Sequence, residues 1–270
     1  MSEIKNTLGG TYRIPLGSDP SESLSFNAIT ETEKLDDGDT LKYVIGASLN
    51  RTPGESTRRL YLEYTHEESD FGDTVATADL FTPGVSFTRS ATDDPVDTRR
   101  GWYLFGDVHG ALNKFLSNSS FLQGRAIARG VYPLTRRVRL LGRAELGYSL
   151  VEQFSELPAS QRFFAGGDQS VRGYRYQSLG PRDADGNVIG GRYLNVFSIE
   201  SEYRVWQNWG AALFLDAGGA DDHPGPTLAK GVGAGLRYRA PIGSLQLDLA
   251  HPMDENESGI RVHIGVRVGV

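Results

Sequence analysis

The stretch Arg162-Phe-Phe-Ala-Gly-Gly-Asp-Gln-Ser-Val-Arg-Gly-Tyr174 is the most informative part of this sequence. Its glycines and hydrogen-bonding side chains are typical of a loop, and it falls within a longer loop that we place at residues 151–190. It nevertheless contains Phe163, Phe164 and Tyr174. Solvent-facing loops seldom hold three aromatic side chains beside an arginine, because such side chains gain most from burial. We therefore expect this loop to pack against another part of the protein.

Outside this loop, apolar and polar residues alternate with a period of two. Leu245, Leu247 and Leu249 fall on one face of a predicted strand, and Gln246 and Asp248 fall on the other. The same alternation, with arginine on the polar face, recurs in segments 138–150, 231–240 and 259–268. A soluble β-sandwich would also alternate, but arginines on one face and Gly and Ala among the apolar residues favour a lipid-facing exterior around a polar interior. We expect the lipid-facing set to include Leu245, Leu247, Leu249, Val262, Ile264 and Val266.

The alternation predicts an all-β protein, an antiparallel transmembrane β-barrel with thirteen strands. We place them near 6–14, 23–33, 40–50, 57–66, 76–91, 99–110, 118–131, 136–150, 191–205, 209–218, 230–241, 243–252 and 259–269. The connections alternate between short turns and longer acidic segments, as expected for periplasmic turns and outer loops. The short turns are Pro133-Leu134, Gln207-Asn208 and Pro241-Ile242-Gly243, and the acidic segments are Asp36–Asp39, Glu67–Asp70, Asp221-Asp222, Asp254–Glu257 and the loop 151–190.

The side of each connection suggests two surface features. Trp206 and Trp209 would lie in the periplasmic aromatic girdle. The acidic outer segments are either simply solvated or bind the divalent ions between lipopolysaccharide head groups.

Composition excludes several other classes of protein. The mean hydropathy of the 270 residues is -0.36, and no run of eighteen apolar residues occurs, which excludes a membrane-spanning helix. Cysteine is absent, so there is no disulfide and no thiolate metal site. The net charge is -6 without a basic stretch, and the five histidines lack ligand spacing. We therefore expect no nucleic-acid partner, no metal and no cofactor.

The segment 162–174 resembles the inward-folded loop of the outer-membrane assembly-factor superfamily, which contains BamA, TamA and the two-partner-secretion transporters. Val171-Arg172-Gly173-Tyr174 matches the family's Val/Ile-Arg-Gly-Tyr/Phe signature, and the run from Arg162 to Asp168 is most similar to TamA. The resemblance is specific over 161–270 and loose over 1–160, where Leu80–Val85 is the best anchor. It implies a functional loop motif consisting of Arg162, Phe163, Phe164, Gly166, Gly167, Asp168, Val171, Arg172, Gly173 and Tyr174.

In that family the loop arginine, here Arg172, pairs with carboxylates on the two strands that follow. The matching positions are Glu200 and Asp216. Strand parity supports both assignments, because Glu200 lies opposite Ile199 and Tyr203, and Asp216 lies opposite Leu213 and Leu215. Both carboxylates are therefore expected in the lumen, where a guanidinium could bind one or both. The alternative is that they are ordinary lumen-lining charges.

The last predicted strand resembles the family's C-terminal targeting strand. The matching residues are Gly259, Ile260, Val262, Ile264 and Gly265. The sequence departs from the family pattern at Val262 and His263, where aromatic residues are usual, and it ends in Val270. We expect weaker recognition of this strand by the assembly machinery.

Three enzyme signals are weak. The run Gly231–Gly235 looks like a dinucleotide loop, but it lies on an alternating strand with no helix after it. A hydrolase at the barrel rim would need Ser, His and a carboxylate together, for example around His251 with Asp254 or His66 with Glu67. Isolated rim residues explain these positions far better, and a metal hydrolase would need a histidine cluster. We expect no enzyme activity.

The resemblance implies a TamA-type insertase in the bacterial outer membrane, which helps barrel proteins such as autotransporters to fold through a seam between the first and last strands. Its partners would be outer-membrane lipid, unfolded barrel clients and a TamB-like protein anchored in the inner membrane. The alternative is a passive pore or a two-partner-secretion transporter.

The family barrel has sixteen strands, so the thirteen predicted here would match its last thirteen. We expect residues 1–270 to form a single barrel domain that lacks the first three strands, the periplasmic modules and a signal peptide. The first and last of thirteen up-and-down strands run in the same direction. The barrel should therefore be open between 6–14 and 259–269, or closed by a strained parallel pairing, and should insert poorly alone.

Overall fold

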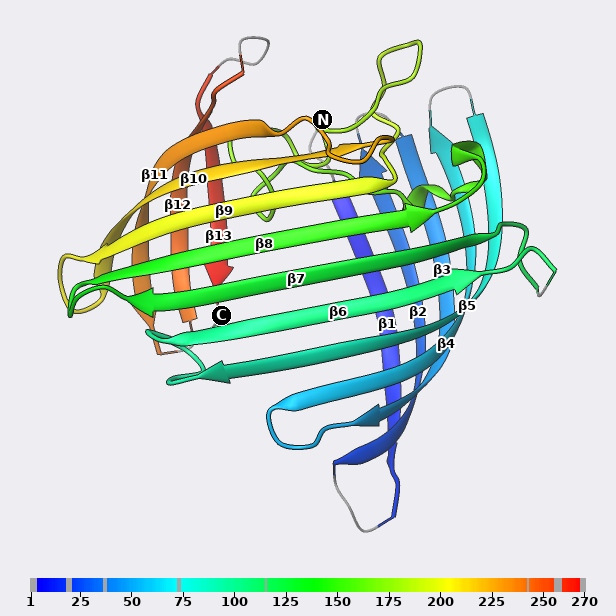
Figure 1. Cartoon of the computed structure of the whole chain (residues 1–270), viewed down its shortest axis with the longest axis horizontal. Coiled ribbons are helices and arrows are strands. Elements are labelled where there is room, and N and C mark those ends of the chain that lie inside the picture. Colours follow the sequence, from blue (N-terminus) through cyan, green and yellow to red (C-terminus); the bar gives the residue numbers. More distant parts are fainter. Residues whose placement is uncertain are drawn as a thin grey trace.

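The chain forms one curved sheet of thirteen strands that rolls into an incomplete barrel around a long loop (Figure 1). The computed structural model describes residues 4–17, 21–35, 38–71, 74–114, 116–241, 243–254 and 259–267. Consecutive strands pair antiparallel throughout, from β1 to β13 in chain order. The prediction of an all-β fold with thirteen antiparallel strands is confirmed.

The strands lie within a few residues of their predicted positions. They are β1 (Ile4–Pro15), β2 (Glu22–Leu35), β3 (Gly38–Arg51), β4 (Ser56–Phe71), β5 (Thr74–Thr92), β6 (Gly101–Ala111), β7 (Phe121–Pro133), β8 (Val138–Leu150), β9 (Tyr193–Arg204), β10 (Trp209–Asp221), β11 (Ala229–Ala240), β12 (Gly243–Pro252) and β13 (Arg261–Arg267). Two short 3-10 helices, η1 (Phe154–Glu156) and η2 (Ala159–Gln161), begin the loop between β8 and β9. In the described part of the chain, no helix has the length and apolar character needed to cross a membrane.

The two faces of the sheet differ as the alternation predicted. The residues expected to face lipid, Leu245, Leu247, Leu249, Val262, Ile264 and Val266, are all exposed on the outer face. Their neighbours on the inner face include the buried side chains of Asp248, Arg237 and Arg239. Apolar side chains cover the outer face of the sheet and paired charges fill its interior. This is the arrangement of a barrel that spans a membrane.

One predicted outer segment is part of a strand. Residues Glu67–Asp70 were expected to form an acidic loop, but they continue β4 to Phe71 and pair with both β3 and β5. The alternation explains this, since Glu67 and Ser69 are buried on the inner face while Glu68 and Asp70 are exposed. Parts of other predicted features (Asp36-Asp37, Ile242, Glu255–Glu257 and the end of the last strand at 268–270) lie outside the described residues.

The two edge strands are not joined. The sheet runs from β1 to β13, and no hydrogen-bonded ladder connects these two strands among the described residues. Since neighbouring strands alternate in direction, β1 and β13 point the same way (Figure 1). Of the two predicted arrangements, an open edge or a strained parallel closure, the structure has the open edge.

The loop 151–192 occupies the interior of the sheet and contributes to each of its hydrophobic clusters. Phe163 and Ala165 pack with Leu194, Val196 and Ala220 of the neighbouring strands. Further along the loop, Val171 and Tyr174 pack with Ala229 of β11. The apolar clusters therefore lie between the loop and the inner wall, which is formed by β9, β10 and β11 and, around Leu157, by β5, β6 and β7.

Candidate functional site

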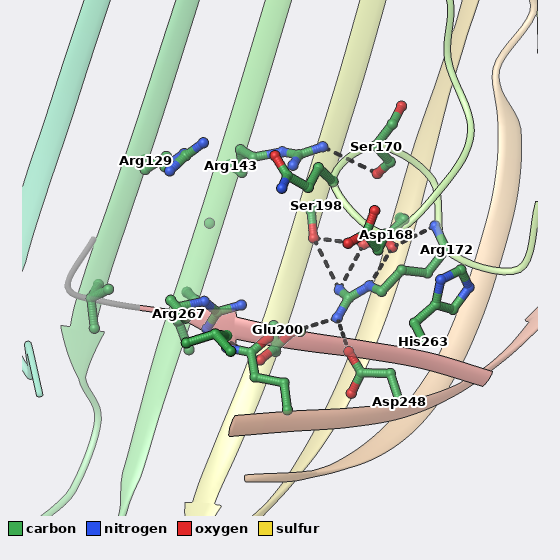
Figure 2. A pocket seen from close by; sticks show the side chains of 18 of the residues that line it. Arg129, Arg143, Asp168, Ser170, Arg172, Ser198, Glu200, Asp248, His263 and Arg267 are labelled. Atoms are coloured by element: carbon green, nitrogen blue, oxygen red, sulfur yellow. Dashed lines mark hydrogen bonds and ion pairs between the residues drawn. The ribbon is translucent and has the colours of Figure 1, made fainter. Parts of the chain in front are cut away.

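Arg172 of the inward loop binds three carboxylates from three strands (Figure 2). Its Nε donates to Asp216 Oδ2 at 2.8 Å and its Nη2 donates to Asp216 Oδ1 at 3.0 Å, so the guanidinium grips this carboxylate with two parallel bonds. Its Nη1 donates to Glu200 Oε2 at 2.8 Å and to Asp248 Oδ2 at 2.9 Å. The two-bond geometry is specific for arginine, because an ammonium cannot form it.

The strands place these carboxylates as the parity argument expected for Glu200 and Asp216. Glu200 is on β9, Asp216 is on β10, and both side chains are buried on the inner face. Asp248 on β12 is a third partner that the sequence reasoning did not assign to the site. The sequence feature that could have identified Asp248 as a partner is its position on the polar face of the 244–250 strand.

Charge around Arg172 is well compensated. Burial lowers the pKa of the Arg172 guanidinium, but the hydrogen bonds and negative charges of Asp216 and Glu200 outweigh burial, so the pKa is raised. The guanidinium also lies 3.4 Å from the ring centroid of Phe214. Arg172 therefore keeps its positive charge at any physiological pH.

The residues that follow Arg172 lie in close contact with the inner wall of the sheet. Gly173 has a φ of 99°, and a Cβ atom there would lie 2.9 Å from the backbone nitrogen of Pro252. The N–H of Gly173 donates to His263 Nε2 at 3.2 Å, which connects the loop to β13. The hydroxyl of Tyr174 donates to the carbonyl oxygen of Lys230 at 3.0 Å. These contacts attach the signature residues to β11, β12 and β13.

Glycines in the wall make room for the loop. A Cβ on Gly147 would lie 2.5 Å from the ring of Phe163, and a Cβ on Gly231 would lie 2.0 Å from the carbonyl oxygen of Arg172. The inner face of the sheet therefore fits this loop closely around Phe163 and around Arg172.

The remaining motif residues have mainly structural contacts. Arg162 donates to the carbonyl oxygens of Leu157 at 2.8 Å and Ile189 at 3.2 Å. Phe163 and Val171 are buried, Phe164 is half-buried, and Gly166 and Gly167 have positive φ angles. Asp168 is exposed and lines a cavity in the lumen. Among the motif residues, Arg172 is therefore the one whose side chain binds a cluster of carboxylates.

A second layer of ion pairs surrounds the three carboxylates. Arg237 is fully buried between Glu200, at 2.8 Å, and Asp248, at 2.5 Å. Glu202 accepts bonds from the side chains of Arg139 and Arg239, at 2.8 Å and 2.9 Å. Such buried charges persist only when paired, because an isolated ion loses its hydration without replacement. The network therefore makes the position of the loop depend on β8, β9, β11 and β12 together.

The predicted C-terminal signal residues are separate from this network. Gly259 and Ile260 precede β13, while Val262 and Ile264 are exposed on its outer face. Gly265 lies on the inner face of the same strand. His263 is the residue that connects this strand to the loop site.

The histidines proposed as parts of a hydrolase have no serine partner in the described part of the chain. His66 Nδ1 lies 2.8 Å from Asp79 Oδ1, and His251 Nδ1 lies 3.0 Å from the carbonyl oxygen of Gly259. Gly231–Gly235 lies inside β11 and not in a phosphate-binding turn. The described residues also contain no group of three or more His, Asp or Glu side chains that could hold a metal ion.

Comparison with curated proteins finds relatives among outer-membrane assembly factors. The chain is 25% identical to the outer membrane protein assembly factor BamA of Nitratidesulfovibrio vulgaris over 275 residues, which cover 94% of the chain and 34% of that protein. It is 24% identical to a SAM50-like protein of Schizosaccharomyces pombe, covering 95% of the chain and 60% of that protein. The chain therefore spans less than two thirds of the length of these relatives.

Solved structures show the same fold. BamA from Haemophilus ducreyi lacking POTRA domains 1-3 matches 97% of the chain and 62% of that structure, with a TM-score of 0.81 and 17% identity. CdiB from Escherichia coli matches 96% of the chain and 52% of that structure, with a TM-score of 0.62 and 14% identity. The model of the Omp85 superfamily domain matches residues 4–269. The chain therefore belongs to the Omp85 superfamily and is an outer-membrane β-barrel of the kind found in BamA.

Proposed function

We propose that this barrel belongs to a TamA-type insertase, a non-enzymatic factor that assembles and helps secrete barrel proteins such as autotransporters. The observation that carries the proposal is the edge of the last strand, β13, which pairs only with β12 in the described residues. The similarity of the run from Arg162 to Asp168 to TamA supports the finer assignment. The relationship to BamA supports the general class of activity.

The physical basis is the cost of unpaired backbone groups in lipid. A client strand that enters the bilayer alone leaves its N–H and C=O groups unsatisfied, and each such group costs several kcal/mol. The open edge of β13 offers the missing hydrogen bonds, so the client strand can be added by β-augmentation. This mechanism needs no nucleotide, cofactor or nucleic acid.

Partners follow from the same mechanism. We propose that unfolded outer-membrane proteins are the clients, outer-membrane lipid is the medium, and a TamB-like protein anchored in the inner membrane delivers clients from the periplasmic side. The exposed Trp206 and Trp209 on the β9–β10 turn would lie at the periplasmic membrane surface.

A two-partner-secretion transporter is the second candidate, since the fold is also that of CdiB. In that case the lumen would carry the substrate and the edges would be secondary. The loop 151–192 fills the lumen and is held there by buried ion pairs, which favours the insertase.

Photo-crosslinking tests which surface meets the client. A photoreactive residue would replace Leu8 on β1, Ile264 on β13 or Leu213 on the interior strand β10, in the full-length protein during autotransporter assembly. These side chains are 75%, 78% and 68% exposed, so their reactivity toward lipid is matched. The proposal expects client adducts at Ile264 and few at Leu8 and Leu213. Equal yields at all three positions, or adducts only inside the lumen, would contradict it.

A further inference from the structure

A cavity of about 320 Å³ lies in the lumen beside the Arg172 network (Figure 2). Its lining includes Arg129 of β7, Arg143 of β8, Gln246 of β12 and Arg267 of β13. Residues Asp168–Ser170 of the inward loop close one side. The cavity therefore joins the barrel wall, the loop and the C-terminal strands.

Arg129 and Arg143 face each other directly across the β7–β8 ladder. Figure 2 shows the two side chains next to each other on the same side of the cavity. Like charges in opposed positions on a sheet destabilise the pair. In the described residues, no carboxylate oxygen lies within 4.0 Å of either guanidinium. Two neighbouring positive charges therefore form no ion pair among the described residues.

Other lumen arginines near this cavity do have a carboxylate. Arg125 lies on the same strand as Arg129, four residues before it. Its Nε binds Glu145 at 2.9 Å. Arg267 binds Glu202 at 3.2 Å, and Arg172 is neutralised by its three partners. Arg143 and Arg129 have weaker contacts. Arg143 donates to the carbonyl oxygen of Ser170 at 3.1 Å, and the guanidinium of Arg129 lies over the ring of Tyr103.

Buried donors in this cavity also lack acceptors. Within the part of the chain that the structure describes, Arg143 Nε and Gln246 Nε2 are buried and have no hydrogen-bond partner. Buried polar groups are nearly always paired, so these N–H groups call for an acceptor. A water molecule would satisfy a donor but would leave Arg129 and Arg143 without an ion pair. An anion would do both, since guanidinium groups bind oxyanions through short charge-assisted bonds.

We propose that this cavity binds one small oxyanion, a phosphate or carboxylate group, between Arg129 and Arg143, with the amide of Gln246 as a further donor. The bound group would cancel the repulsion across the β7–β8 ladder. It would also tie the loop to the wall, because Arg143 holds the carbonyl of Ser170. The site is independent of the free edges and does not rest on the proposed insertase activity.

Asp168 is the competing occupant that the chain itself provides. Its exposed carboxylate lines the same cavity, although it forms no ion pair with Arg129 or Arg143 in the structure. If a shift of the loop brought Asp168 onto the two arginines, an external anion would be excluded. Asp168→Asn therefore distinguishes the two arrangements, since it should leave or strengthen binding of an added anion under our proposal.

Isothermal titration of the folded whole chain in zwitterionic detergent, at low chloride, tests the site with inorganic phosphate and, separately, acetate. We expect one phosphate to bind per barrel. Acetate should displace this phosphate if the site accepts any oxyanion, and should leave it bound if the site selects phosphate. Arg129→Gln and Arg143→Gln should each weaken binding at least about tenfold, the loss expected for one strong charge-assisted contact. Arg125→Gln is the matched control and should bind as the parent does, because Arg125 already has Glu145.

Three results would overturn the proposal. They are the absence of saturable binding to the parent protein, an equal loss in Arg125→Gln, and binding that appears only after Asp168→Asn. Folding of every variant is checked by its heat-dependent gel mobility. If Arg143→Gln does not fold, Arg129→Gln and Arg129→Lys decide the question, with partial retention expected for the lysine because it keeps the charge and loses the planar fork.

Discussion

Arg172 combines a loop position with the surroundings of a core residue. Three carboxylates and an aromatic ring surround its guanidinium, and its backbone N–H also donates to Asp216 Oδ2 at 3.1 Å. A loop of this length would ordinarily lose much conformational entropy on packing inward. The ion pairs offset that loss at one point, which is why a single residue can decide where the whole loop lies.

Arg172→Ala should release the inward loop. Removing one partner of a buried ionic cluster costs about 3–5 kcal/mol, because the remaining charges are left uncompensated. We expect a lower unfolding temperature on heat-modifiability gels and faster proteolysis between residues 162 and 190. Arg182→Ala in the same loop is the control, since Arg182 is exposed and binds only backbone oxygens of Ser178 and Gly186. Wild-type protease resistance in Arg172→Ala would contradict the pairing as the source of loop stability.

Asp248→Asn tests the partner that the sequence reasoning missed. The amide keeps the size of the side chain but removes the negative charge between Arg172 and Arg237. Hydrogen bonds to charged groups contribute about 1.5–3 kcal/mol, so we expect a destabilisation in that range and below that of Arg172→Ala. Denaturant unfolding followed by tryptophan fluorescence measures it. A change as small as that of an exposed carboxylate, for example Asp185→Asn, would show that Asp248 is not part of the network.

Side-chain parity is the part of the site that sequence reasoning predicts well. A strand has a strict period of two, so placing Ile199 outward necessarily places Glu200 inward. Which inward residues meet across the lumen is a different matter. The contact of Asp248 with Arg172 and that of Arg237 with Glu200 depend on how far the sheet curls. No local pattern in the sequence records that curvature.

At the scale of elements, β12 shows how strictly the two faces are separated. Leu247 points outward and Gln246 points into the lumen. Leu247→Arg places a charge in the hydrocarbon region and should cost about 2–4 kcal/mol near the bilayer midplane. Gln246→Arg places the same charge in a polar interior and should be tolerated better. Folding yield into lipid vesicles compares the two, and equal losses would mean that the faces are misassigned.

The contact between the loop and β13 depends on a histidine. His263 Nε2 accepts the N–H of Gly173, so His263→Phe would leave that buried donor without an acceptor. We expect faster proteolysis of the loop and less protection of β13 in hydrogen exchange. His223→Phe is the control, because that histidine is on the surface, where its side chain is 86% exposed. Unchanged exchange of the 261–267 amides in His263→Phe would show that the contact does not stabilise β13.

Element boundaries were predictable to a few residues, and the largest error has a physical cause. Four consecutive polar residues, Glu67–Asp70, were expected to leave the sheet. They remain in β4 because their inward members are buried under the loop, where Glu67 accepts the N–H of Ser160. A barrel with a polar interior tolerates polar residues on the inner face of a strand, so polarity alone does not end a strand there.

At the scale of the whole molecule, the number of strands decides the geometry of closure. Thirteen alternating strands leave β1 and β13 running in the same direction, and this could be foreseen from the strand count. That these edges stay apart follows from the structure and not from the count. The loop and its ion pairs hold β9 to β12 together from inside, and the sheet therefore remains rolled although its edges are free.

The filled lumen predicts a small and unsteady conductance for the folded chain in planar bilayers. The loop 151–192 packs against β9, β10 and β11, and the ion pairs of Arg172 and Arg237 cross the space that a pore would need. Replacing residues 159–190 by a short Gly-Ser linker should raise the conductance several-fold. The linker can close the gap without moving the strands, because Tyr148 and Tyr193 already pair across the β8–β9 ladder.

Removal of only the tip of the loop, residues 183–187, is the matched control for this deletion. The tip is a surface turn closed by its own bonds, in which the backbone N–H of Asp183 donates to the carbonyl of Asn187 at 3.0 Å. Its loss leaves the Arg172 contacts in place, so the conductance should stay low. If the intact chain instead forms a large, stable pore that the longer deletion does not widen, the lumen is the conducting element. The transporter reading would then replace the insertase, because a client strand at the free edge of β13 needs no open channel through the barrel.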